Sequence, residues 1–241
     1  MKSRVLARSA EDGALIRLRD ELLPMPRPRS QDLFSEGGKR LPCWLQGDER
    51  LGDDWLIALD YYPLYYNLFH LLSRGAAQLR FLEIGVRTGY VAVVFFRAVT
   101  CHRHYVGVDP NEYVRKGLRY ARNTLSVLKA TDPRFGFELI TGYSTDPKIQ
   151  SRLRSMPPFD LVHIDGDHSL VGKLRDLEFA RHLIAPNGLV LVDDVVHHPL
   201  IEDAVARSLA LGWYDRSCIV PTKRGLALLG VPFRTSDVDA I

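Results

Sequence analysis

The sequence lacks any hydrophobic run long enough to cross a membrane. No apolar stretch approaches the roughly 18 residues of a membrane span. The first residues include Arg4, Arg8 and Glu11, where a signal peptide would need an apolar core. These absences predict a cytoplasmic protein without a membrane partner.

A strong charge of one sign and a cysteine framework are also missing. The 241 residues carry a formal net charge of +3, and their lysines and arginines are scattered. Because no basic stripe with interleaved aromatics appears, nucleic acid is not an expected partner. The cysteines are three in number and lack metal-ligand spacing (Cys43, Cys101, Cys218), which indicates a reducing compartment. A small-molecule substrate remains as the expected partner, and assembly into a homo-oligomer stays open.

The chain divides by texture into two parts. Residues 1–78 combine a charged helical segment (11–23), a proline-rich stretch and a loop spotted with Gly and Asp; we expect a helical cap on the substrate side. Residues 55–74 have helical spacing interrupted by Pro63, which should end or kink the helix. The tyrosines of this segment suit core packing, with substrate contact as the alternative (Tyr61, Tyr62, Tyr65, Tyr66).

Residues 79–241 read as one α/β domain, because apolar strand patterns alternate with helical ones. The expected strands are 79–85, 104–110, 135–142, 159–165 and 188–194, and the expected helices are 90–99, 111–129, 146–155, 170–184 and 200–210. Residues 218–231 predict two strands around a Lys-Arg-Gly turn. The pattern therefore predicts a doubly wound, Rossmann-like, mostly parallel sheet of seven strands that ends in an antiparallel hairpin.

Acidic residues follow two of these predicted strands. Asp165 and Asp167 follow one, and Asp193 and Asp194 end the next. Ligands of parallel sheets bind beyond the carboxyl ends of the strands, so we expect these carboxylates to converge there. Their mutual repulsion favours neutralisation by a cation, and a hard divalent metal suits carboxylate oxygens.

A glycine turn follows the first strand of the series. It contains Glu83, Gly85 and Gly89, with glycines that allow a tight turn and a close approach of the next helix. The G-x-G-x-x-G pattern of dinucleotide-binding enzymes is absent, which disfavours a hydride-transfer oxidoreductase. Asp109 ends the second strand, where an acid accepts hydrogen bonds from ribose hydroxyls.

Taken together, these motifs resemble the class I S-adenosylmethionine-dependent methyltransferases over residues 78–241. The resemblance implies that Glu83, Gly85 and Gly89 hold the methionine part of the donor and that Asp109 holds the ribose. It implies a donor contact also for four further residues, of which the first three lie beside the adenine: Gly142, Tyr143, Ser144 and Asp165.

Within that class, the sequence is similar to the metal-dependent O-methyltransferases of the catechol, caffeoyl-coenzyme A and macrocin types. The similarity implies that Asp165, Asp193 and Asp194 bind Mg²⁺ or another divalent cation. It also implies that His168, three residues after Asp165, is the catalytic base at a place where the family often has lysine. The ordinary pKa of histidine, near 6.5, suits this role.

Structural roles are the alternative for several of these residues. Asp167 and Asp193 suit caps of helices or turns, and His163 suits the core. Of His197 and His198, at least one should lie at the surface, with the rim of the substrate site as the other option. Asp176 is expected to serve in packing or an ion pair.

The sequence therefore predicts a Mg²⁺-dependent O-methyltransferase that uses S-adenosylmethionine to methylate a hydroxyl of a small molecule. A metal-independent N- or O-methyltransferase of the same fold is the first alternative. A binding module without catalysis would be expected to lack the glycine turn or the ribose acid. Which of catechols, sugars and natural-product intermediates is the substrate stays open.

Overall fold

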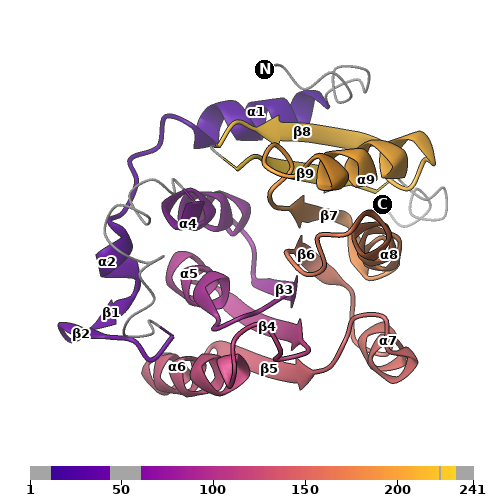
Figure 1. Ribbon diagram of the computed structural model, residues 1–241. Coiled ribbons are helices and arrows are strands. Elements are labelled where there is room, and N and C mark those ends of the chain that lie inside the picture. The colour runs from indigo at the N-terminus through magenta and orange to yellow at the C-terminus, as the bar shows by residue number, and fades with distance from the viewer. Residues whose placement is uncertain (1–11, 44–60, 223, 232–241) are drawn as a thin grey trace. The chain divides into compact units, whose positions relative to one another are not determined.

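The computed structural model describes residues 12–43, 61–222 and 224–231 (Figure 1). Among them, strands β3 to β9 form a seven-stranded sheet in the order β5-β4-β3-β6-β7-β9-β8. The predicted fold class is confirmed, since the sheet is mostly parallel and its last hairpin is antiparallel. The chain forms two compact units.

The unit Glu21–Tyr143 contains three parallel strands, β3 (Gln78–Ile84), β4 (His102–Asp109) and β5 (Phe135–Thr141). Its longer helices are α4 (Tyr61–Leu72), α5 (Tyr90–Ala98) and α6 (Gly117–Thr131). Short α2 (Ser30–Leu33) precedes a small hairpin of β1 (Ser35–Glu36) and β2 (Lys39–Arg40). Ile84 pairs with Val108 and Asp109 with Thr141, so the carboxyl ends of these strands lie at one edge.

Aromatic side chains form much of the core of this unit. Helix α4 packs on α5 (Figure 1), and the rings of Phe69, Phe81 and Phe95 contact one another. Tyr61 and Tyr65 are buried in the same cluster, as the packing interpretation expects. Pro63 is tolerated because it falls in the first turn of α4, where a proline removes no helical hydrogen bond. The part of the expected helix before residue 61 lies outside the described residues.

The unit Met1–Asp20 with Ser144–Ile241 contains the parallel pair β6 (Phe159–Ile164) and β7 (Ile184–Val192). The antiparallel hairpin β8 (Arg216–Val220) and β9 (Leu226–Gly230) continues it, with β9 beside β7. Helices α8 (Leu170–Ala180) and α9 (Pro199–Ala210) pack together (Figure 1), and α7 (Pro147–Arg154) precedes β6. Most of α1 (Gly13–Leu22) belongs here, and the backbone N–H of Asp12 donates to Ser217.

Helix α6 begins at Gly117, whereas the sequence predicted a start at residue 111. The reason is local. Asn111 and Lys116 have positive φ angles of 63° and 67°, which a right-handed helix cannot accommodate. The Asn111 side chain instead accepts a hydrogen bond from the backbone N–H of Leu118 at 3.0 Å. No helix within the described residues is both long enough and apolar enough to span a membrane.

Gly89 allows α5 and α6 to approach each other closely. Its φ is +90°, and a Cβ at this position would lie 3.0 Å from the Cβ of Ala121 on α6. Gly75 has a similar φ of +76° but no atom within 4 Å of such a Cβ. Both Gly→Ala substitutions should cost about 1–2 kcal/mol for the left-handed backbone, and Gly89→Ala should lower the free energy of unfolding further. Urea denaturation of the two variants checks this; equal losses would contradict the close-approach argument.

Candidate active site

Asp109 organises the glycine turn after β3. Its Oδ2 accepts hydrogen bonds from the backbone N–H groups of Val86 at 2.9 Å and Arg87 at 2.8 Å, and its Oδ1 accepts from Asn111 at 2.6 Å. The turn itself uses positive φ angles at Gly85 (94°) and Gly89 (90°). Because a carboxylate offers about four lone-pair sites, Asp109 can hold the turn and still accept a hydroxyl.

Glu83 lies below this turn, in the sheet. It is buried and accepts a hydrogen bond of 2.5 Å from the hydroxyl of Tyr105 on β4. Burial, followed by the negative charge of Glu83, raises the pKa of Tyr105 well above its ordinary value, so the phenol keeps its proton. This contact ties β3 to β4 at the point where the turn begins.

The residues after β5 separate into different environments. The N–H of Gly142 donates to the backbone oxygen of Asp109 at 3.0 Å. Tyr143 is 54% exposed, and its hydroxyl donates to Glu112 at 2.6 Å. Ser144 belongs to the other unit, where its hydroxyl donates to Asp176 at 2.5 Å. Asp176 is buried, in keeping with the packing role expected for it.

Three predicted metal ligands converge in the unit that contains β6 and β7. Ile164 pairs with Val192, so Asp165 and Asp193 follow their strands at the same edge. Asp165, Asp193 and Asp194 each offer an oxygen within 4.8 Å of the others. We call these three residues the acidic cluster. Asp193 and Asp194 are buried, and Asp194 has a positive φ of 63°, a conformation that turns the chain sharply just after β7.

Arg224 also reaches the acidic cluster, a contact that the sequence analysis missed. Its guanidinium donates two hydrogen bonds to the two carboxylate oxygens of Asp194 and lies 3.6 Å from Asp193. The backbone holds it there, because the N–H groups of Val195 and Val196 donate to the backbone oxygens of Gly225 and Arg224. The sequence signal for this contact was the Lys-Arg-Gly turn. It would have pointed to Asp194 only if the strand that follows the turn, β9, had been predicted to pair with β7.

A second cation, Lys173 on α8, is fully buried in the same unit. Its Nζ donates to the backbone oxygen of Ile164 at 3.4 Å, immediately before Asp165. The burial of Lys173 was not predicted from the sequence either. Leu170, Leu177 and Ala180 mark one face of α8 at helical spacing, and Lys173 occupies that face in place of an apolar residue.

His168, which the resemblance implies as the catalytic base, lies beside the acidic cluster. Its Nε2 is 3.4 Å from Asp165 Oδ1 and 3.9 Å from Asp194 Oδ2. Burial raises the pKa of Asp165. The hydrogen bond with His168 and the charges of His163, Lys173 and Arg224 outweigh burial, so the pKa falls below its ordinary value and Asp165 stays ionised.

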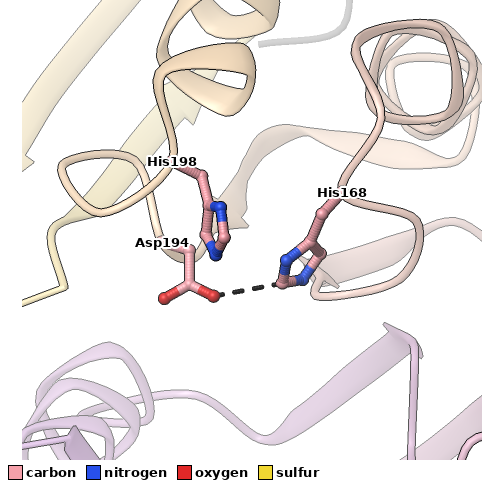
Figure 2. A group of neighbouring side chains, drawn as sticks. All are labelled: His168, Asp194 and His198. Atoms are coloured by element: carbon pink, nitrogen blue, oxygen red, sulfur yellow. Dashed lines mark ion pairs between the residues drawn. The ribbon is translucent and has the colours of Figure 1, made fainter.

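The other residues with open roles have distinct surroundings. His198 is half-buried before α9, with its ring centroid 4.9 Å from that of His168 (Figure 2), while His197 is exposed. Asp167 is exposed and accepts from the N–H and hydroxyl of Ser169, which fits a turn cap. His163 is buried in β6.

The acidic cluster suits a hard divalent cation by the chemistry of its donors. Carboxylate oxygens from three residues are near enough to share one ion, and hard cations such as Mg²⁺ bind through carboxylates and waters. Arg224 uses one lone pair on each oxygen of Asp194, so a cation would have to share this carboxylate or displace the guanidinium.

Comparison with known proteins supports the methyltransferase class that was expected from the sequence. Residues 82–195 match the family described as a methyltransferase domain. The O-methyltransferase ankF of Aspergillus thermomutatus is 27% identical over 142 residues, which cover 58% of this chain and 56% of ankF. The chain therefore matches about half the length of that relative.

Solved structures share the fold. The O-methyltransferase of Bacillus cereus, solved with SAH, has a TM-score of 0.58 at 18% identity, over 95% of this chain and 100% of that one. The O-methyltransferase TomG of Streptomyces achromogenes, solved with SAM, has a TM-score of 0.54 at 22% identity, over 93% and 92% of the two chains. These matches confirm the predicted Rossmann-like fold, and residues 82–195 are similar to a methyltransferase domain.

Asp176 should make stability depend on pH. Burial raises its pKa from 3.8 to about 6, although the Ser144 hydrogen bond and the charge of Lys173 oppose the shift. The folded state therefore keeps this proton to higher pH than the unfolded state, and stability falls as pH rises from about 4 to about 6. Between pH 5 and pH 7 the free energy of unfolding of the wild type should fall by about 1 kcal/mol more than that of the Asp176→Asn variant. Urea denaturation at both pH values measures this; parallel pH profiles would refute it.

Proposed function

We propose that the chain is an S-adenosylmethionine-dependent, Mg²⁺-dependent O-methyltransferase acting on a hydroxyl of a small molecule. The observation that carries this proposal is the acidic cluster with His168 3.4 Å from Asp165, a proton acceptor beside a set of hard-cation ligands. The O-methyltransferase names of ankF, the Bacillus cereus protein and TomG support the reaction type.

The donor would be held by the residues at the ends of β3, β4 and β5. The turn that contains Gly85 and Gly89 would hold the methionine part, and Asp109 would present acceptors for ribose hydroxyls. Glu83 supports the turn from below through Tyr105. Gly142, Tyr143 and Ser144 are proposed to lie beside the adenine, and Asp165 is proposed to contact the donor as well as the cation.

The chain's own contribution to the chemistry is proton transfer and alignment. When bound, the donor supplies an electrophilic methyl group, and a divalent cation lowers the pKa of a nearby hydroxyl. His168 accepts the hydroxyl proton at Nδ1, because its Nε2 faces the ionised carboxylate of Asp165 and donates to it. The same carboxylate stabilises the resulting imidazolium. Arg224 and Lys173 offset the negative charge that the cluster retains. Alignment of the freed oxygen with the methyl group supplies much of the rate.

One observation favours a metal-independent methyltransferase as the second candidate. The guanidinium of Arg224 already supplies a positive charge to Asp194 and lies 3.6 Å from Asp193. In that case Arg224 would take over the neutralising role of the cation, and the acidic cluster would only shape the pocket. Removal of the metal with a chelator separates the two candidates.

Removal of the metal should abolish turnover. We expect EDTA to stop release of S-adenosylhomocysteine with a panel of catechol, phenol and sugar acceptors, and Mg²⁺ or Mn²⁺ to restore it. Asp194→Ala should be nearly inactive yet still bind S-adenosylhomocysteine in calorimetry. Asp167→Asn is the matched control, since Asp167 is exposed and outside the cluster. Full activity in chelator would favour the metal-independent candidate.

Loss of the base should affect kcat. His168→Ala should lower kcat by roughly 10²- to 10⁴-fold, with binding of S-adenosylhomocysteine and Mn²⁺ largely unchanged in calorimetry. The exposed neighbour His197, changed to Ala, serves as the control and should keep its kcat. If His168→Ala retains wild-type kcat while His197→Ala or His198→Ala is inactive, the base comes from the segment after β7 instead.

A further inference from the structure

A second group of ligands shares Asp194 with the acidic cluster. One atom from each of His168, Asp194 and His198 lies within 4.8 Å of the others. Figure 2 shows both imidazole rings turned toward the Asp194 carboxylate, with the ion pair from His168 dashed. We call these three residues the histidine group.

Local structure holds the histidine group in place. The backbone N–H of His198 donates to the backbone oxygen of Asp194 at 2.9 Å, so residues 194–198 form a closed turn. His198 is the residue before α9, but its side chain makes no capping hydrogen bond to the helix. His168 comes from the loop between β6 and α8, and its ring meets that of His198 edge-on. The imidazole of His198 is therefore not required to begin α9.

We propose that the histidine group binds a borderline divalent cation, with Zn²⁺ as the representative ion. Two imidazoles and one carboxylate prefer such ions, whereas Mg²⁺ prefers oxygen ligands alone. Three protein ligands with an open fourth position form an ordinary zinc site. Zinc binds nitrogen at about 2.0–2.1 Å, which puts ligand atoms about 3.4 Å apart. Rotation of the two half-exposed rings would bring the group from 4.8 Å or less to that spacing.

The ion pair between Arg224 and Asp194 does not prevent the histidine group from binding a cation. The guanidinium takes one lone pair on each oxygen of Asp194, and the remaining lone pairs are open to a cation. Asp194 is also the ligand common to the histidine group and the acidic cluster. Zinc and magnesium would therefore compete for one carboxylate.

Inhibition of the enzyme follows, and this consequence rests on the proposed function. A neutral imidazole has one nitrogen lone pair for either a proton or a metal, so a zinc ion on His168 occupies the lone pair that would accept the hydroxyl proton. Zinc bound by the histidine group would thus remove the base and withdraw Asp194 from the acidic cluster. Zn²⁺ should inhibit turnover at a fixed concentration of Mg²⁺.

Binding is tested directly by titrating metal-free protein with Zn²⁺ in calorimetry, and with Co²⁺, whose visible absorption reports its ligands. We expect one ion per wild-type chain and at least about 10-fold weaker binding by His198→Ala, since loss of residues that merely orient a ligand already costs 10- to 100-fold. His197→Ala, which alters the adjacent histidine, should bind like the wild type. Absent zinc binding, or equal binding by His198→Ala, overturns the proposal. Thermal melting confirms that the variants are folded.

A turnover measurement tests the inhibition separately. With Mg²⁺ fixed, Zn²⁺ should inhibit the wild type and His197→Ala, and turnover by His198→Ala, taken relative to its own zinc-free rate, should be at least about 10-fold less sensitive to Zn²⁺. Zinc that binds in calorimetry without inhibiting would contradict the inhibitory role. If no acceptor is methylated under any condition, the proposed function fails, while the calorimetric result still decides whether the histidine group binds zinc.

Discussion

The repulsion among three carboxylates at the ends of β6 and β7 is the constraint on which the candidate site depends. Oxygens of Asp165, Asp193 and Asp194 lie within 4.8 Å of one another. At an effective dielectric constant of about 20, each such pair of charges repels by about 3 kcal/mol. A fold that brings these carboxylates together must supply positive charge at the same place.

The chain supplies part of that charge itself. Arg224 binds Asp194 from the β8–β9 hairpin, Lys173 approaches from α8, and His168 lies beside Asp165. None of these groups forms part of the oxygen donor set that a hard cation uses. The negative charge of the acidic cluster can therefore be neutralised in two ways, by the protein's own cations or by a bound metal ion. The proposed metal dependence means that the bound ion neutralises it during catalysis. A zinc ion bound by the histidine group would be a third cation competing for Asp194.

Much of the fold was predictable because strand and helix patterns alternate regularly after residue 78. The convergence of the Asp-Gly-Asp-His segment and the Asp-Asp strand end was likewise predictable, since neighbouring parallel strands end at the same edge of a sheet. Arg224 was not predicted, because its contact with Asp194 depends on the register between β7 and β9, where Val192 pairs with Ala227. The burial of Lys173 and the bond between Ser144 and Asp176 likewise depend on how α8 packs.

The central claim is that the acidic cluster holds a hard divalent cation in a chain that binds a methyl donor. A crystal grown with Mn²⁺ and S-adenosylhomocysteine tests it most directly, through anomalous scattering from manganese. The account predicts one anomalous peak within coordination distance of oxygens from Asp165, Asp193 and Asp194, with S-adenosylhomocysteine at the glycine turn. A map with S-adenosylhomocysteine bound, no manganese peak and Arg224 still on Asp194 would contradict it.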